Sequence, residues 1–549
     1  MASTEISVQT TQPCSKPSSP AQDSGVERKE TVVSLESQES EPKTTASHNE
    51  TILGQGAENI ILTENDCPDA LATAWSSWKR WKILMVIFLV QTSMNFNTSL
   101  YANGQSGIVQ EFGIDPQVAV SGAAVFLITY AFGCELWAPW SEEFGRKIVL
   151  QASLVLVNIC CIPVALAHVY HYFPAIIIGR TLGGLFSAGG SVTLGMVADM
   201  FSTDEQEHPL AFIVLSSVGG SILGPILGGF VEEYLHWTWT IWIQLIFGVF
   251  VQVLHLTTVP ETRAAVLIEE HAKKLRRSGE KPNVYGPDEL KTAKERFVPT
   301  EILSLWARPF RMLARERIVS ILSMLSGFSD ALVFMQIQCF SRVFKLWGFS
   351  TIQVGLAFIP IGIGYLLGYA LFVLVIRRNR ILRETNPASE NAQYESRLWM
   401  LLFAAPCLPI GMAIFAWTST PAAHWIAPMI GWVVIGMANY TIYLTTIDYM
   451  VAAYGPYSAS ATGGNGFCRD FFAGVLTWAA GPYYDAFPFD YGLQVANTIL
   501  AAISLLLMVA TIFVYFRGPS LRKNSPFAQS LNENNESAGR IVLPPTMDI

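Results

Sequence analysis

The chain has 549 residues, of which 51% are hydrophobic and only 14% are charged, and its formal net charge is −8. Soluble proteins carry about 25% charged residues, so this composition argues against a soluble enzyme of several domains. Many uninterrupted apolar runs of about 20 residues instead predict an all-α membrane protein with many spanning helices. The eight cysteines form no CxxC or Cys/His spacing, and we therefore predict neither a disulfide framework nor a metal site.

The two ends of the chain are polar. Residues 1–74 are rich in Ser, Thr, Glu, Gln and Pro and poor in aromatic residues, which predicts a disordered cytoplasmic tail. The start has no basic segment followed by an apolar core, so we expect no signal peptide. Residues 518–549 are a second polar tail, which we also place in the cytoplasm.

Twelve apolar segments follow in two sets of six, and each set predicts a six-helix bundle. The N-terminal bundle is expected over 75–258 and the C-terminal bundle over 317–517. Equal halves of this kind are typical of a transporter with a substrate path between them. The expected spans are 83–104, 118–139, 148–167, 173–197, 209–231, 239–258, 317–341, 351–376, 398–417, 425–450, 456–480 and 493–516.

Basic residues predict the orientation of these spans. If both termini are cytoplasmic, almost all loop Lys and Arg residues lie inside, with Arg342 and Lys345 as exceptions. This is the asymmetry that membrane proteins show. The segment 259–316 belongs to the inner side and contains Lys273-Lys274-Leu275-Arg276-Arg277. It predicts a basic amphipathic linker that lies on the inner membrane face.

A short charged turn joins the second and third spans and reads Pro139–Lys147. Gly145 can adopt the positive φ that a sharp reversal needs. Glu142 and Arg146 are one helical turn apart, so their charges predict a latch that a moving neighbour helix makes or breaks, with Lys147 beside it. The alternative is a simple positive-inside signal.

The fifth span contains a run of small residues at regular spacing. Glycines at this spacing let another helix approach closely, and a proline within the run removes a backbone donor and bends the helix. The alternative is a generic packing face. The residues are Gly220, Gly224, Pro225, Gly228 and Gly229.

With these motifs, residues 75–520 resemble the major facilitator superfamily, most closely its fungal twelve-span drug:proton antiporter branch. Gly220–Gly229 resembles the antiporter motif of that branch, which is associated with export, and Pro139–Lys147 resembles its loop motif. The resemblance implies alternating access between two bundles. Further similar stretches are Pro260–Arg263, Arg308–Phe310, Gly355–Gly362, Ser396–Leu398 and Tyr457–Ala461. Departures from the pattern are Ala138, Glu143 and Ala452, where the family commonly has Gly, a basic residue and Asp.

Ionisable residues within the predicted spans are candidates for transport and proton coupling, because a charge in lipid is costly unless paired or hydrated. Glu135 and Asp330 are our candidates for proton carriers, and Arg180 would set the charge of the cavity. The alternatives are hydrogen bonding to a neighbouring span for Glu135 and snorkelling for Arg180. Asp448 lies near a helix end, which favours an interfacial role, and Arg469 either neutralises Asp470 or faces the cavity.

Amide side chains in the spans are candidates for lining a wet cavity. Asn95 and Asn97 cannot both face the same side of a helix, so about half of these residues should instead connect helices by hydrogen bonds. The candidates are Asn95, Asn97, Gln336, Gln338 and Asn439.

We therefore expect a secondary active transporter that exports a small organic molecule, such as a drug, toxin or secondary metabolite, by proton antiport. One alternative is an exporter of citrate-like organic acids, and another, from a different class, is a non-transporting nutrient sensor. No P-loop or catalytic constellation is present, so we predict neither an enzyme nor a cofactor. The expected partners are the substrate, protons and the lipid bilayer, with no nucleic acid. We expect a monomer in the plasma membrane, with the vacuolar membrane as the alternative.

Overall fold

The computed structural model describes residues 60–202, 205–287, 289–290, 299–386, 389, 394–454, 457–488, 491–523 and 525. Most of the predicted tails, 1–59 and 526–549, lies outside the described residues. The described chain is almost entirely helical, which confirms the predicted all-α membrane protein. Short helices accompany the long ones because several spans continue as a 3₁₀ turn or a second helix.

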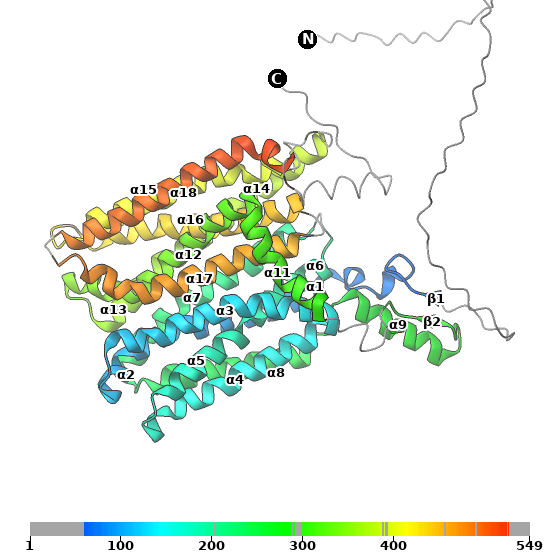
Figure 1. Cartoon of the computed structure of the whole chain (residues 1–549), viewed down its shortest axis with the longest axis horizontal. Helices are drawn as coiled ribbons and strands as arrows, with labels where there is room; N and C mark the ends of the chain where they lie inside the picture. The colour runs from blue at the N-terminus through cyan, green and yellow to red at the C-terminus, as the bar shows by residue number, and fades with distance from the viewer. Residues whose placement is uncertain are drawn as a thin grey trace, which may run out of the picture. The chain divides into compact units, whose positions relative to one another are not determined.

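The N-terminal half contains the six expected spans (Figure 1). The first is extended at its end by η3 (Leu100–Gly104) and α2 (Gln105–Phe112), and the fourth is divided around η4 (Ala188–Ser191). The spans are α1 (Ser77–Ser99), α3 (Pro116–Phe144), α4 (Arg146–Tyr170), α5 (Pro174–Ser187) with α6 (Val192–Met200), α7 (Glu207–Tyr234) and α8 (Thr238–Thr258).

The C-terminal half repeats this pattern (Figure 1). Its first span ends in η5 (Lys345–Trp347), and its second is preceded by α13 (Thr351–Leu356), which begins with a capping box between Ser350 and Gln353. Such a box satisfies the free N–H groups of the first turn. The long helices are α12 (Arg317–Phe344), α14 (Ile359–Thr385), α15 (Ser396–Thr418), α16 (Ile426–Tyr454), α17 (Ser458–Asp485) and α18 (Gly492–Lys523).

Eleven helices of the described chain are long and apolar enough to cross a membrane. The helix α17 is 28 residues long but is not among them. Its interior holds Asn465, Arg469 and Asp470, all buried, and it packs between α3 and α12. Because the neighbouring helices cover its polar face, α17 need not be apolar all round. That α17 forms the twelfth span remains a prediction.

The linker contains α9 (Ala264–Ser278), β2 (Val284–Tyr285) and α11 (Pro299–Arg315). Its α9 and β2 form a small folded unit with residues 60–74, whereas α11 packs against α12 and α17. The predicted tail is wrong for residues 60–74, because β1 (Ile60–Ile61) pairs in parallel with β2, and η1 (Pro68–Ala70) and η2 (Ala72–Ala74) follow it (Figure 1). The reason is an apolar core of five buried residues that the polar composition of the tail conceals: Leu62, Cys67, Ile268, Ala272 and Val284.

An ion pair completes this unit. Arg276 donates from Nη1 to Glu289 Oε2 at 2.9 Å and to the carbonyl oxygen of Val284 at 2.6 Å. The hydrogen bond from Arg276 lowers the pKa of Glu289 below its ordinary value. The pair therefore contributes most above the ordinary carboxyl pKa and is lost as the pH falls through the lowered value.

The two halves meet along pairs of helices from opposite bundles. The helix α3 packs against α17, and α7 packs against α13 and α14. Because the spans alternate in direction, the helix ends at Phe144, Met200 and Thr385 lie at the end of the bundle next to the linker. We call this end the linker side, and the end that holds residues 102–117, 232–238 and 342–355 the far side.

Candidate transport path between the bundles

A cluster of three charges lies between the halves. Arg469 and Asp470 are consecutive residues of α17, and Asp330 lies on α12; their side chains are 9% exposed or less. Arg469 Nη2 is 3.2 Å from Asp470 Oδ1, and Arg469 Nε is 3.6 Å from Asp330 Oδ2. We call these residues the buried charge cluster. Pairing compensates part of the cost of removing each charge from water.

The cluster also touches the N-terminal half. Arg469 Nη1 donates to Ser217 Oγ of α7 at 3.4 Å, and its guanidinium lies 4.3 Å from the ring centre of Tyr443 on α16. The first of these contacts joins the two bundles. Any rotation of one bundle against the other therefore changes the surroundings of this arginine.

Glu135 of α3 lies close to the cluster and faces the other bundle. A Cβ atom on Gly463 of α17 would be 2.8 Å from either carboxylate oxygen, so the carboxyl group of Glu135 packs closely against the backbone of α17. Glu135 is 8% exposed, and its Oε1 has no hydrogen-bond partner among the described residues. A buried carboxylate costs free energy unless a proton or a cation neutralises it.

Two cavities flank this region. The smaller one measures about 270 Å³ and extends from the buried charge cluster toward the linker side. Its lining includes Arg469, Asp470 and Glu135, together with Glu142 and Arg146 of the charged turn. The cavity therefore places the candidate proton carrier and the candidate latch on one continuous surface.

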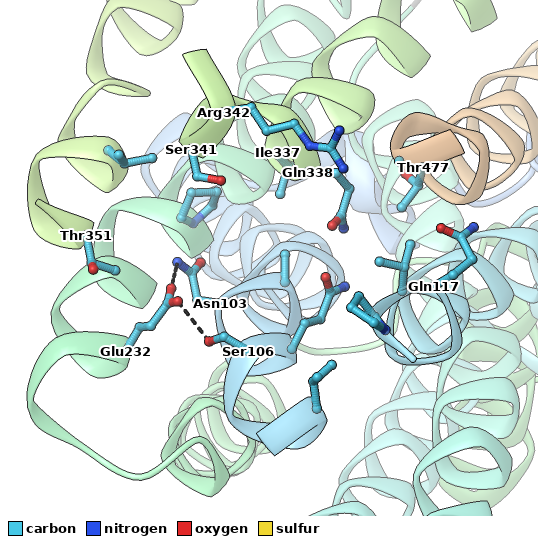
Figure 2. A pocket seen from close by; sticks show the side chains of 18 of the residues that line it. Asn103, Ser106, Gln117, Glu232, Ile337, Gln338, Ser341, Arg342, Thr351 and Thr477 are labelled. Atoms are coloured by element: carbon cyan, nitrogen blue, oxygen red, sulfur yellow. Dashed lines mark hydrogen bonds between the residues drawn. The ribbon is translucent and has the colours of Figure 1, made fainter. Parts of the chain in front are cut away.

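The larger cavity measures about 720 Å³ and lies at the far side (Figure 2). Polar side chains from both halves surround it, including Gln117 and Thr477 of the central helices α3 and α17. Glu232 accepts hydrogen bonds from Asn103 at 3.1 Å and from Ser106 at 2.9 Å along one wall. The volume of this larger cavity lies within the range of about 300–1,000 Å³ that is typical of small-molecule sites.

A charge network closes the linker side between the two halves. Glu207 of α7 accepts a hydrogen bond from Arg383 of α14 at 2.6 Å and lies 3.5 Å from Arg397 of α15. Arg397 also pairs with Asp448 of α16. We call these four residues the linker-side network. Asp448 thus lies in an ion pair in the last two turns of α16 and lines neither of the two cavities. Sequence analysis did not predict Glu207 as part of this network.

Arg180 lies inside the N-terminal bundle. Its Nη1 donates to the carbonyl oxygen of Asn97 at 3.0 Å, and its guanidinium lies 4.0 Å from the ring centre of Phe126 and 4.5 Å from that of Tyr101. It is 3% exposed and lines neither of the two cavities. The structure therefore places Arg180 in aromatic packing, where it neither snorkels nor faces the path.

The charged turn has a different main partner from the one expected. Arg146 Nε lies 3.0 Å from Asp199 Oδ2 of α6, whereas the nearest contact to Glu142 is 3.8 Å. Asp199 lies one residue before the end of the fourth span. This position is the only feature of the sequence that suggests Asp199 as a partner for Arg146. The guanidinium of Arg146 also donates to Ser141 Oγ at 2.6 Å.

Glu261 of the linker caps the N-terminus of α4. It accepts hydrogen bonds from the backbone N–H groups of Arg146 at 2.9 Å and Lys147 at 3.0 Å. A carboxylate at this position satisfies free N–H groups and interacts well with the helix dipole. Gly145 has φ +95°, and a Cβ atom there would lie 2.6 Å from Glu261 Oε2, so the turn requires glycine.

The small residues of α7 face two different helices. Cβ atoms on Gly220, Gly224 and Gly228 would lie 2.0–2.8 Å from atoms of α1 or η3. On another face, the carbonyl oxygen of Pro225 lies 2.6 Å from the Cβ position of Gly355, and Gly229 lies against α13 of the other half. The same stretch therefore packs within one bundle and between the two bundles.

The predicted amide residues are divided between these roles. Gln338 lines the larger cavity. Asn439 donates to Ser329 Oγ at 3.1 Å beside Asp330, and Gln336 donates to the hydroxyl oxygen of Tyr484 at 2.8 Å. Asn95 bonds the carbonyl oxygen of Gln91 at 3.0 Å, and the side chain of Asn97 faces α4. These four residues line neither of the two cavities and instead connect or support helices.

Paired six-helix halves, a charged interface and a cavity on either side of it define a membrane transporter fold. A profile of the Major Facilitator Superfamily matches residues 84–477. The chain therefore belongs to the major facilitator superfamily, whose members are transporters and not enzymes, and it is a multi-pass membrane protein.

Similar proteins agree with this family. The MFS-type transporter paaT of Penicillium rubens is 30% identical over 461 residues, which are 84% of this chain and 82% of that protein. The "Probable drug/proton antiporter YHK8" of Saccharomyces cerevisiae is 28% identical over 86% of this chain and 91% of its own length. Among solved structures, the proton:xylose symporter XylE matches with a TM-score of 0.56 at 17% identity, covering 80% of this chain and 96% of that one. The last match supports the fold alone.

Proposed function

We propose that this protein exports a small organic molecule, such as a drug, toxin or secondary metabolite, in exchange for protons. It works by alternating access between its two bundles. The proposal includes α17 as the twelfth span, both termini in the cytoplasm, a monomeric state and a plasma-membrane location, with the vacuolar membrane as the alternative. The relative described as a drug/proton antiporter supports the coupling ion.

The charge balance of the path is the observation that carries this proposal. Two carboxyl groups, those of Asp330 and Asp470, pair with the single guanidinium of Arg469, and a third, that of Glu135, lines the same cavity as Arg469 and Asp470. Fully ionised, these groups would leave an excess of two negative charges at membrane depth, which is costly. Binding protons removes that cost, and so does binding a cationic substrate. The two ligands can therefore compete for the same carboxyl groups, as an exchanger requires.

The arrangement of the cavities supports an exchange between two sides. The linker-side network joins the halves at one end, while the larger cavity lies at the far side. In this conformation, the substrate would leave the far side and a proton would enter from it. Opening of the linker-side network would then expose the smaller cavity to the cytoplasm.

The charge balance of the path argues against an exporter of organic acids. A citrate-like substrate carries negative charge and needs an excess of cationic groups in its path. Arg180, which made this alternative attractive, is packed within one bundle away from both cavities. We therefore favour a neutral or cationic substrate.

Untargeted mass spectrometry tests the proposed activity. The small-molecule content of cells and medium is compared with and without the protein, at two external pH values. We expect one class of compound to move outward more strongly at the lower external pH. If no compound moves while the protein is correctly inserted, export is contradicted.

Carboxyl variants then test the coupling. Glu135→Gln and Asp330→Asn should reduce the dependence of export on external pH, because each removes a group that can exchange a proton. The matched control is Glu384→Gln, whose carboxylate is 64% exposed on α14. A variant that keeps full pH-dependent flux removes its residue from the coupling mechanism.

A further inference from the structure

Four side chains with metal-binding chemistry gather on the far side of the N-terminal half. Glu111 ends α2, His168 lies in the last turn of α4, His171 follows that helix, and His236 precedes α8. Ligand atoms of Glu111, His168 and His236 all lie within 4.8 Å of one another. This group is separate from the buried charge cluster and from the linker-side network.

We propose that these residues bind a divalent transition-metal ion of the zinc class. Imidazole nitrogen and carboxylate oxygen are ligands that zinc prefers, with bonds of about 2.0–2.2 Å. A tetrahedral arrangement with such bonds separates the ligand atoms by roughly 3.4 Å. His236 Nε2 already lies 3.4 Å from Glu111 Oε2, and His168 Nδ1 contacts Glu111 Oε1. Small shifts of these side chains, which move His168 and Glu111 slightly apart, would place three ligand atoms at such separations.

The surrounding groups orient two of these ligands. The indole N–H of Trp237 donates to Glu111 Oε2 at 2.5 Å, and His236 Nδ1 lies 3.1 Å from Thr238 Oγ1. The second contact occupies the ring nitrogen that faces away from Glu111, so Nε2 is directed toward the carboxylate. Outer hydrogen bonds of this kind fix the orientation of metal ligands.

Accessibility and backbone conformation also fit an ion site. The side chains of His168 and His236 are each 46% exposed, whereas that of Glu111 is 13% exposed, so an ion can reach the carboxylate from solvent. His171 has φ +46°, the one positive φ among the described non-glycine residues. Its Nδ1 lies 3.9 Å from Glu111 Oε1, within reach of a fourth ligand position. Such uncommon backbone conformations often occur at functional sites.

The position of the site gives it a consequence for transport. The histidines and Glu111 belong to the three far-side connections of the N-terminal half, so one ion would hold these connections together. The helix α2, which ends at the site, also contributes Ser106 and Val109 to the wall of the larger cavity. A bound ion would therefore restrain one wall of that cavity.

Zinc titration of the full-length protein tests the proposal. Purified protein is treated with a chelator, returned to metal-free buffer and titrated with ZnCl₂ by isothermal calorimetry. We expect one zinc ion per chain. His168→Ala and His236→Ala should each weaken binding by at least about tenfold, because each removes a direct ligand.

The matched control is His424→Ala, which changes an exposed histidine in a connection of the other half. This variant should bind zinc as the natural chain does. If the natural chain binds no zinc, or if all four proteins bind equally, the proposal is overturned. Glu111→Gln provides a variant of nearly unchanged shape should an alanine variant fold poorly, and it should weaken binding as well.

Discussion

At the scale of single residues, the buried charges depend on each other. Among the residues that the structure describes, Arg469 is the one cation in contact with Asp330 and Asp470, and all three side chains are nearly inaccessible. Removing one partner of a buried pair leaves the other charge without compensation. That loss generally costs more than the intact pair contributes.

We expect Arg469→Gln to lower the free energy of unfolding by roughly 3–5 kcal/mol, because two carboxylates remain buried without a cation. The midpoint of thermal unfolding of the purified protein measures this effect. Arg380→Gln, in an exposed ion pair of α14, is the control and should cost less than about 0.5 kcal/mol. A restored midpoint in the double variant Arg469→Gln/Asp470→Asn would support the pairing. Equal midpoints for Arg469→Gln and the control Arg380→Gln would contradict it.

Gly145→Ala should destabilise the charged turn by roughly 1–3 kcal/mol, because φ +95° is unfavourable for alanine and the new methyl group meets Glu261. Gly279 is a suitable comparison: its φ is +78°, but no atom lies within 4 Å of its Cβ position. Gly279→Ala therefore measures the backbone effect alone. Thermal unfolding should show the larger loss for Gly145→Ala, and the reverse order would argue against the Glu261 contact.

Sequence alone predicted which charged residues lie within the spans better than it predicted their partners. Arg469 and Asp330 stood out because ionisable residues in apolar spans are rare. The contacts of Arg146 with Asp199 and of Glu207 with Arg383 join distant parts of the chain. They depend on how each helix is rotated about its axis, which hydrophobicity does not fix. The burial of Arg180 within one bundle escaped prediction for the same reason.

At the scale of elements, α7 shows how one stretch meets two neighbours. A Cβ atom on Gly224 would lie 2.0 Å from Ser99 Oγ and 2.7 Å from the backbone nitrogen of Leu100, so α1 could not keep its present distance. Gly219, in the same helix, has no atom within 4 Å of its Cβ position. A comparison of alanine variants at these two glycines therefore separates the effect of packing on stability from the effect of helix propensity.

Gly224→Ala should cost roughly 1–3 kcal/mol through overpacking, whereas Gly219→Ala should be neutral or stabilise by up to about 1 kcal/mol. Thermal unfolding of the two variants side by side measures the difference. Equal midpoints would mean that α1 can move away from α7 at little cost.

The spans themselves were predictable from apolar runs, since each expected segment coincides with a long helix. The helix α17 is the exception, because its composition is less apolar than that of the eleven candidate spans. Arg469 and Asp470 reduce its mean hydropathy although both side chains are buried. The apolar residues of the segment 456–480 nevertheless predicted a span there. Residues 60–74 show the opposite error, because a polar composition concealed a few apolar contacts.

At the scale of the whole molecule, the linker-side network would, in the proposed alternating-access cycle, hold one of two arrangements of the bundles. Glu207 connects α7 of one half to α14 and α15 of the other. Loss of this connection should favour the conformation that opens toward the linker. An equilibrium between two conformations shifts about 5–30-fold for each 1–2 kcal/mol.

Glu207→Gln should therefore increase the accessibility of Cys134, a natural cysteine in the lining of the smaller cavity, by roughly fivefold. The rate of its modification by a maleimide, followed by mass spectrometry of peptides, measures this change. Glu384→Gln is again the control. An unchanged or lower rate in Glu207→Gln would contradict a closing role for the network.

The linker also decides where this polypeptide can be divided. Its β2 pairs with β1 near the start of the described chain, and its Glu261 caps α4, whereas α11 packs against α12 and α17. Two co-expressed fragments, 1–290 and 299–549, should thus associate and co-purify in higher yield than fragments 1–258 and 259–549. A better yield from the second pair would show that the linker serves only as a tether. The boundary between the two halves of the protein therefore lies within the linker, well after the sixth span ends.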